Sequence, residues 1–217
     1  MFELKRKHMN LKDLVDRLQI RLKNELPGAK AHEQMRAVPT GNLKPIFDHK
    51  LSPKPGGVLI LLYEENGILK FPLIKRPVYV GAHSGQISLP GGKCEHGEDG
   101  IQAALREAEE EIGIERSLVQ IAGTLSNFFV MPSNFIITPV IGVIYQHPAF
   151  KPDAFEVDKI LIATLADIIR EDAIKKKNII AAGQFEMNAP HFEIESEIVW
   201  GATAMMLNEF RVVINEI

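Results

Sequence analysis

The stretch that decides the fold spans residues 91–114 and reads GGKCEHGEDGIQAALREAEEEIGI. In its second half Ile101, Leu105, Ala108 and Ile112 recur at helical spacing and form one apolar stripe. Gly113 follows them, and glycine is the commonest residue just past a helix end. The pattern therefore predicts a helix over residues 99–112, entered from a glycine-rich loop.

Three carboxylates accompany the apolar stripe. Glu107, Glu110 and Glu111 stand at positions i, i+3 and i+4, so they should share one side of the helix. Like charges repel, and the helix dipole disfavours negative charge in the last turns. A hard divalent cation would compensate, because Mg²⁺ binds a few carboxylates together with water and substrate phosphates. The alternative interpretation is a solvated acidic face, which is the commoner origin of such a run.

The neighbours of these carboxylates follow a fixed spacing. The residues concerned are Gly92, Glu98, Arg106, Glu107, Ala108, Glu110, Glu111, Gly113 and Ile114. This spacing resembles the sequence box of the Nudix hydrolases. The resemblance implies an α/β fold, namely an α/β/α sandwich with a central mixed sheet and a loop-helix-loop catalytic element.

The resemblance also implies a chemistry, in which water attacks a diphosphate linked to another moiety. Glu107, Glu110 and Glu111 would be catalytic and would bind Mg²⁺ or Mn²⁺, joined by the carbonyl oxygen of Gly91. Gly92, Glu98 and Arg106 would support the loop. The general base stays open: it is one of these carboxylates or a group on a later loop, where Glu156 is a candidate and an ordinary surface glutamate is the alternative.

A second motif precedes the box. The chain reads LIKRP over residues 73–77 and HSGQISLPGG over residues 83–92. These segments resemble the additional motif of the coenzyme A diphosphatase branch, although Leu89 replaces a phenylalanine and Gly81 stands where many members carry an arginine. The resemblance implies cleavage of coenzyme A, or an acyl derivative, to 3′,5′-ADP and 4′-phosphopantetheine. The substrate-binding residues would be Arg76, His83, Gly85 and Gln86.

Two alternative functions stay open. The first is a Nudix hydrolase of another nucleoside diphosphate derivative, such as ADP-ribose or a dinucleoside polyphosphate, and Gly81 favours it. The second is a Nudix-fold binding or regulatory module without catalysis. The intact carboxylates argue against the second, since a pure binder has no need of them.

The remaining chain predicts further elements around the box. An Asn66-Gly67 turn between two β-prone runs predicts a hairpin of residues 58–63 and 68–75. Leucines at helical spacing after Asn10 predict a helix over residues 11–22. The other expectations are an irregular connector over 29–55, strands at 135–145 and 160–164, a short helix from 165 to 173, a solvated turn at Lys175–Lys177 and a terminal helix near 200–213.

These elements predict a single domain over residues 1–217. It would consist of an N-terminal helical extension of about 1–53, a core of about 54–190 and a C-terminal helix of about 197–214. Segments 26–28 and 198–204 also resemble flanking regions of the coenzyme A diphosphatase branch, which agrees with extensions around one core.

Composition limits the partners. The chain of 217 residues has a formal net charge of −3, which predicts no nucleic-acid partner. Its apolar runs are too short to span a bilayer, so no membrane association is expected. With Cys94 as its single cysteine, the protein is expected in the cytoplasm, and a homodimer stays open.

Overall fold

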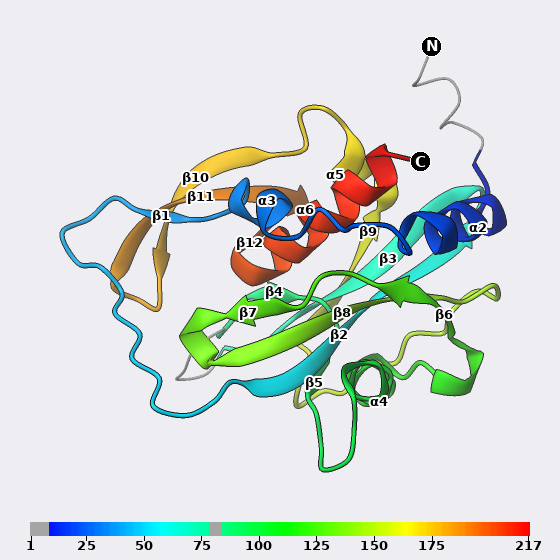
Figure 1. Cartoon of the computed structure of the whole chain (residues 1–217), viewed down its shortest axis with the longest axis horizontal. Coiled ribbons are helices and arrows are strands. Elements are labelled where there is room, and N and C mark those ends of the chain that lie inside the picture. The colour runs from blue at the N-terminus through cyan, green and yellow to red at the C-terminus, as the bar shows by residue number, and fades with distance from the viewer. Residues whose placement is uncertain (1–8, 79–83) are drawn as a thin grey trace.

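The computed structural model describes residues 9–78 and 84–217, and within these ranges the strands form one eight-stranded mixed sheet and one four-stranded sheet (Figure 1). Helices cover both faces of the larger sheet. This architecture confirms the predicted α/β class with a central mixed sheet. In the described ranges, no helix is both long and apolar enough to cross a lipid bilayer.

The larger sheet is built around β2 (Lys54–Glu65). This strand pairs antiparallel with β3 (Ile68–Lys75) and β5 (Gly91–Lys93), and parallel with β8 (Phe135–Val143). The predicted hairpin is confirmed, because Asn66-Gly67 joins β2 to β3 with φ of 53° and 75°. The other strands of this sheet are β4 (Ile87–Ser88), β6 (Gln120–Thr124), β7 (Phe128–Val130) and β9 (Lys159–Thr164).

Strand β2 is buried on both faces, and its alternating side chains enter two different cores. Ile60 and Leu62 belong to the core beneath α2 (Leu11–Arg21) and α6 (Gly201–Asn215). Leu61 belongs to the core beneath α4 (Gly100–Ile112). Because successive strand residues point to opposite faces, one apolar run anchors helices on both sides of the sheet.

Helix α4 begins and ends where the sequence predicts. Asp99 caps the first turn by accepting from the backbone N–H groups of Ile101 and Gln102, and the Gln102 Oε1 accepts from the Asp99 N–H. Gly113 ends the helix in the left-handed conformation at φ 70°. A Cβ on Gly57 would overlap the Gly100 carbonyl oxygen, so glycine there lets the helix start lie directly on β2.

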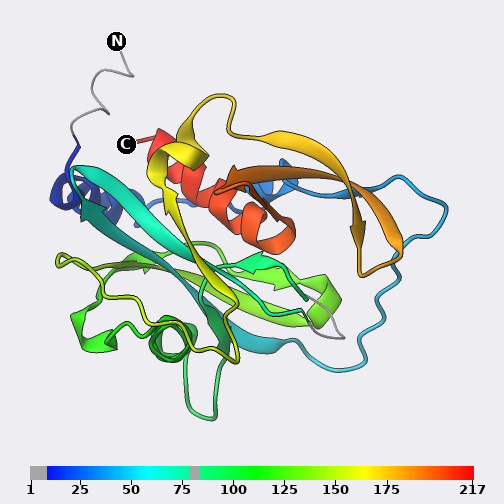
Figure 2. The same ribbon diagram turned by 180° about the vertical axis from the view of Figure 1, so that it is seen from behind.

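A smaller sheet lies on the same side of the larger sheet as α6, away from α4 (Figures 1 and 2). Its strands are β1 (Val38–Pro39), β10 (Lys175–Ala181), β11 (Phe185–Ile194) and β12 (Glu197–Trp200). The terminal helix α6 begins at Gly201, close to the expected 200–213, but residues 197–200 of the expected segment 197–214 form strand β12, because they pair with β11. Short helices complete the described fold: α3 (Gly28–Glu33), α5 (Leu165–Ile169), η1 (Arg116–Leu118) and η2 (Met131–Ser133).

Three further sequence predictions are wrong in this region. Lys175–Lys177 lie in strand β10 and not in a turn, because main-chain pairing with β11 outweighs the weak strand preference of lysine. The connector 29–55 contains most of α3 and the strand β1, which pairs with the distant β11. Helix α5 ends at Ile169 instead of Ala173, with Arg170 already in an extended conformation.

Candidate active site

Three carboxylates converge where α4 faces the loop between β8 and β9. Glu107 and Glu111 come from α4 and Glu156 comes from the loop, and each offers an oxygen within 4.8 Å of the other two. Across the described parts of the chain, no other group of three metal-binding side chains is this compact. We call these three residues the acidic cluster. Its donors are all oxygens, as a hard divalent cation requires.

The loop that carries Glu156 is attached to the end of α4. The Asp153 N–H donates to the Glu111 carbonyl oxygen at 3.0 Å, and the Lys151 N–H donates to that of Ile112 at 2.9 Å. The Asp153 carboxylate then accepts from the Phe155 and Glu156 N–H groups at 2.8 Å and 3.2 Å. These bonds form a compact turn that holds Glu156 beside the helix.

Glu111 is the most buried member of the acidic cluster, with a side chain only 2% exposed. Its Oε2 accepts from the Gly91 N–H at 2.8 Å, and its Oε1 lies 3.6 Å from Arg76 Nη2. Burial raises the pKa of Glu111 to about 7, against the opposing effects of Arg76 and the Gly91 N–H. A bound cation would therefore stabilise a carboxylate that the fold keeps away from water.

Glu107 lies against the glycine loop. Burial raises its pKa, while its contact with Arg106 Nη1 at 3.0 Å acts in the opposite direction. A Cβ on Gly92 would lie 2.5 Å from both carboxylate oxygens of Glu107. Only glycine at position 92 therefore leaves space for this carboxylate at its observed position.

Glu110 is not a member of the acidic cluster. Its Oε2 accepts from Arg106 Nη1 at 3.0 Å, and its side chain is 55% exposed. The helix turns by about 100° per residue, which directs Glu110 away from Glu111 and toward solvent. The expected crowding thus holds for two of the three helix carboxylates, and a role of Glu110 as metal ligand stays a prediction.

Arg106 joins α4 to the preceding loop. Its guanidinium contacts both oxygens of Glu98, at 2.8 Å and 3.1 Å, and donates to the Lys93 carbonyl at 3.0 Å. The hydrogen bonds from Arg106 and from the Glu95 N–H lower the pKa of Glu98. A bidentate pair of this kind fixes orientation as well as distance. The loop 93–98 is held against the helix by these contacts.

Arg76 follows β3 and reaches the acidic cluster. Its backbone N–H donates to the Gln86 carbonyl at 3.0 Å, and the Gly85 N–H donates to the Pro77 carbonyl at 3.1 Å. The Arg76 Nη2 lies 3.4 Å from the Gly91 carbonyl oxygen. Among the four expected substrate-binding residues, Arg76, Gly85 and Gln86 are thus placed at one connection, while His83 lies outside the described residues, as does Gly81.

Glu156, which the sequence offered only as a candidate general base, lies in the acidic cluster of the structure. The sequence supplied only a weak signal, a carboxylate within the acidic segment 153–158 before β9. Its approach to Glu111 depends on the parallel pairing of β8 with β2 and on the turn described above. Neither feature can be read from local spacing.

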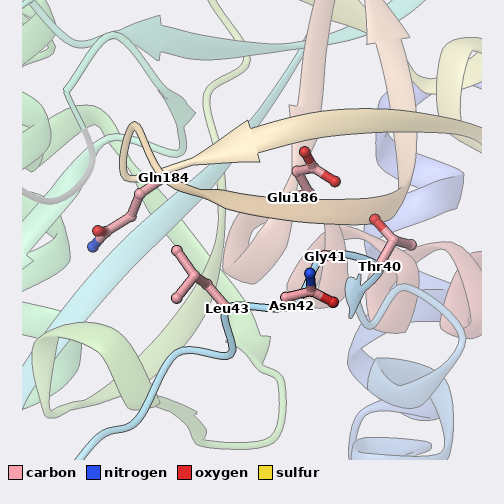
Figure 3. Close-up of a pocket in the computed structure, with 6 residues that line it drawn as sticks. All are labelled: Thr40, Gly41, Asn42, Leu43, Gln184 and Glu186. Carbon is pink, nitrogen blue, oxygen red and sulfur yellow. The ribbon is translucent and has the colours of Figure 1, made fainter.

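A separate cavity of about 450 Å³ lies between the segment after β1 and the turn joining β10 to β11 (Figure 3). The residues that line it are Thr40, Gly41, Asn42, Leu43, Gln184 and Glu186. None of them belongs to the acidic cluster or to its contacts. The candidate active site is therefore the acidic cluster and not this cavity.

Comparison with known proteins gives consistent matches. The NUDIX domain family model matches residues 53–177. Nudix hydrolase 22, chloroplastic, of Arabidopsis thaliana is 35% identical over 167 residues, covering 73% of this chain and 54% of the relative. Mitochondrial coenzyme A diphosphatase NUDT8 of Homo sapiens is 28% identical over 191 residues, covering 87% of this chain and 74% of the relative.

The matches cover only part of some relatives, and the similarity to a solved structure is low. The chain spans 54% and 58% of the lengths of Nudix hydrolases 22 and 15 of Arabidopsis thaliana. Among solved structures, that of a C. elegans Ap4A hydrolase binary complex aligns with a TM-score of 0.45 and 20% identity. The alignment covers 54% of this chain and 83% of that one.

Proposed function

This chain belongs to the NUDIX domain family, and from that premise we propose that it is a metal-dependent pyrophosphohydrolase acting on coenzyme A or its acyl derivatives. The products would be 3′,5′-ADP and 4′-phosphopantetheine or its acyl form. The observation that carries the proposal is the acidic cluster with Arg76 beside it. The resemblance of segments 73–77 and 83–92 to the coenzyme A diphosphatase motif, and the similarity to a relative named for that activity, support the substrate.

The donor set fits Mg²⁺ or Mn²⁺. Glu107, Glu111 and the Gly91 carbonyl would hold the cation, with Glu156 beside them as the third carboxylate of the acidic cluster. Glu110, which is directed toward solvent, would reach the cation through a bridging water. When bound, the cation neutralises the diphosphate and makes a water molecule more acidic. A site made only of oxygens, with buried Glu111 at its base, suits this role better than it suits zinc.

Residues of the chain itself would orient the carboxylates, contact the diphosphate and act as the general base. The Gly91 N–H orients Glu111, and Arg106 orients Glu107 while it also holds the loop. Arg76 contacts the diphosphate through its planar guanidinium. Glu156 is the proposed general base, because it is exposed and comes from a separate loop, whereas Glu111 and Glu107 already bind Gly91 and Arg106.

A product assay tests the proposal. The purified protein is incubated with coenzyme A and Mg²⁺ or Mn²⁺, and the products are separated by chromatography. We expect 3′,5′-ADP and 4′-phosphopantetheine in equal amounts. Absence of these two products with every divalent metal tried would contradict the assignment of coenzyme A as the substrate.

A second candidate function is hydrolysis of another nucleoside diphosphate derivative. Gly81 favours it, because an arginine expected to contact phosphate in the coenzyme A branch is missing there. ADP-ribose and a dinucleoside tetraphosphate are assayed beside coenzyme A at equal concentration. A kcat/KM for either that exceeds the value for coenzyme A would move the assignment to that substrate.

The proposal extends to partners and location. The proposed substrate is a small anionic nucleotide, and the proposed reaction involves neither a nucleic acid nor a membrane. We also propose that the protein is a homodimer, which analytical ultracentrifugation would measure. We propose the cytoplasm as its location, although relatives carry chloroplastic and mitochondrial names. Fractionation of the source cell checks this, and recovery in an organelle would overturn it.

A further inference from the structure

Arg76 reaches the same two groups that are expected to bind the cation. Its Nη2 lies 3.4 Å from the Gly91 carbonyl oxygen and 3.6 Å from Glu111 Oε1. We infer that Arg76 stands in for the divalent cation in the metal-free protein, competes with it for these two groups, and is released toward the substrate phosphates when the metal binds. The inference rests on the proposed function, because it needs the same metal site.

The charges make simultaneous occupation unfavourable. A Mg²⁺ ion binds oxygen at about 2.1 Å, so an ion on the Gly91 carbonyl would lie within about 5.5 Å of Arg76 Nη2. Even in the dielectric of bulk water, a divalent and a monovalent cation at that separation repel enough to weaken binding about tenfold. This repulsion therefore favours a movement of the guanidinium away from the ion.

The surroundings of Arg76 allow this movement. The Arg76 side chain is 29% exposed, whereas that of its partner Glu111 is 2% exposed. The Arg76 backbone stays fixed, because its N–H donates to the Gln86 carbonyl at 3.0 Å. A rotation of the long side chain toward solvent thus breaks both contacts without displacing β3.

Release of Arg76 couples the two binding events. A guanidinium freed from Glu111 is available for a bidentate contact with phosphate oxygens close to the metal. By linkage, a phosphate that draws Arg76 away from Glu111 must in turn strengthen metal binding. Arg76 would then be a positioning residue for the metal site in addition to contacting the substrate.

The test is a calorimetric Mg²⁺ titration without substrate, at the same pH for every variant. We expect Arg76→Ala to bind Mg²⁺ about tenfold more tightly than the wild type, and Arg76→Lys, which keeps the charge, to lie closer to the wild type. The control is Arg116→Ala, which removes an arginine that contacts Glu109 on the same helix at 3.1 Å, outside the acidic cluster. Its affinity should equal that of the wild type.

A melting experiment shows whether a change in Mg²⁺ affinity comes from misfolding of the variant. Metal-free Arg76→Ala should melt below the wild type, and saturating Mg²⁺ should raise its melting temperature by more than it raises that of the wild type. An Arg76→Ala affinity equal to or weaker than that of the wild type overturns the inference while the metal site stands. Absence of Mg²⁺ binding in the wild type and in every Arg76 variant overturns the proposed function itself.

Discussion

Adjacent glutamates on α4 differ sharply in their surroundings. Glu111 is buried and accepts from the Gly91 N–H, whereas Glu110 is 55% exposed and contacts Arg106. The burial that raises the pKa of Glu111 also removes competing water, so an ion there would replace a missing hydration shell. The two carboxylates are therefore expected to contribute unequally.

Glu111→Gln should lower kcat by about 10³-fold with the fold intact, because a neutral amide cannot offset the charge of the metal in the transition state. Steady-state kinetics with circular dichroism measure both effects. Glu109→Gln is the matched control, since Glu109 lies on the same helix and contacts Arg116 instead of the acidic cluster. Turnover of Glu111→Gln within threefold of the wild type would contradict the metal site and favour a non-catalytic binding module.

Glu156→Gln should lower kcat by about 10²-fold or more, because loss of a general base removes a contribution of this size. The acidic limb of the pH–kcat profile should also flatten, which a merely structural role would not produce. Glu186→Gln is the control, since Glu186 lies at the separate cavity (Figure 3). An unchanged profile with unchanged kcat would remove Glu156 from the mechanism.

At the scale of elements, the bounds of helix α4 are set by the residues at its two ends. The capping box of Asp99 and Gln102 begins it, and the left-handed Gly113 ends it, so its bounds follow from residues close in sequence. Strand β10 is the opposite case. Its three lysines give no strand signal, and only main-chain pairing with β11 makes the segment extended.

Asp99→Ala should lower the free energy of unfolding by about 1 kcal/mol, the usual cost of losing an N-cap. Urea unfolding measures this cost. Because the acidic cluster lies at the other end of α4, kcat should stay within about twofold of the wild type. Asp172→Ala removes an exposed carboxylate near Arg170 and serves as the control, with no expected loss of stability. Equal stability of both variants would show that the cap does not support the helix.

At the scale of the whole molecule, Glu209 on α6 joins both ends of the described chain to the core. Its buried carboxylate contacts His32 Nε2 and accepts from the Gly28 N–H, both at 2.9 Å. It also accepts from Ser126 Oγ at 2.6 Å, on the connection between β6 and β7. The proposed single domain over 1–217 rests on this junction and on the core shared by α2, α6 and β2.

Glu209→Ala should destabilise the protein by about 3 kcal/mol, because it leaves His32 and two further donors without their buried acceptor. Chemical denaturation followed by fluorescence and by circular dichroism measures the loss. One coincident transition in wild type and variant would support a single domain. Two separated transitions would instead mean that the extensions unfold independently of the core.

The junction at Glu209 also predicts a pH dependence. Burial by itself would raise the pKa of Glu209, but hydrogen bonds from His32, Ser126 and the Gly28 N–H lower it overall from its ordinary value of 4.5. Stabilisation by this carboxylate is therefore complete above about pH 4.5 and is lost as the pH falls through the depressed folded pKa. Unfolding free energies between pH 3 and pH 6 should show a steeper loss in wild type than in Glu209→Gln.

The sequence by itself determined the features that depend on near neighbours. The capped ends of α4 and the Asn66-Gly67 hairpin follow from local spacing and turn chemistry. The α/β class is what the resemblance of the box residues implied. Neighbour effects of this kind act within a few residues, so they can be read along the chain.

Only the tertiary structure decided which groups meet at the site. Glu156 reaches Glu111 from the loop between β8 and β9, and Arg76 reaches it from the connection that follows β3. The helix rotation leaves Glu110 at the solvent side. The lysines of β10 became strand residues for the same reason. Long-range pairing and packing, which no local pattern encodes, set these distances and assemble the acidic cluster from a glutamate-rich helix and a distant loop.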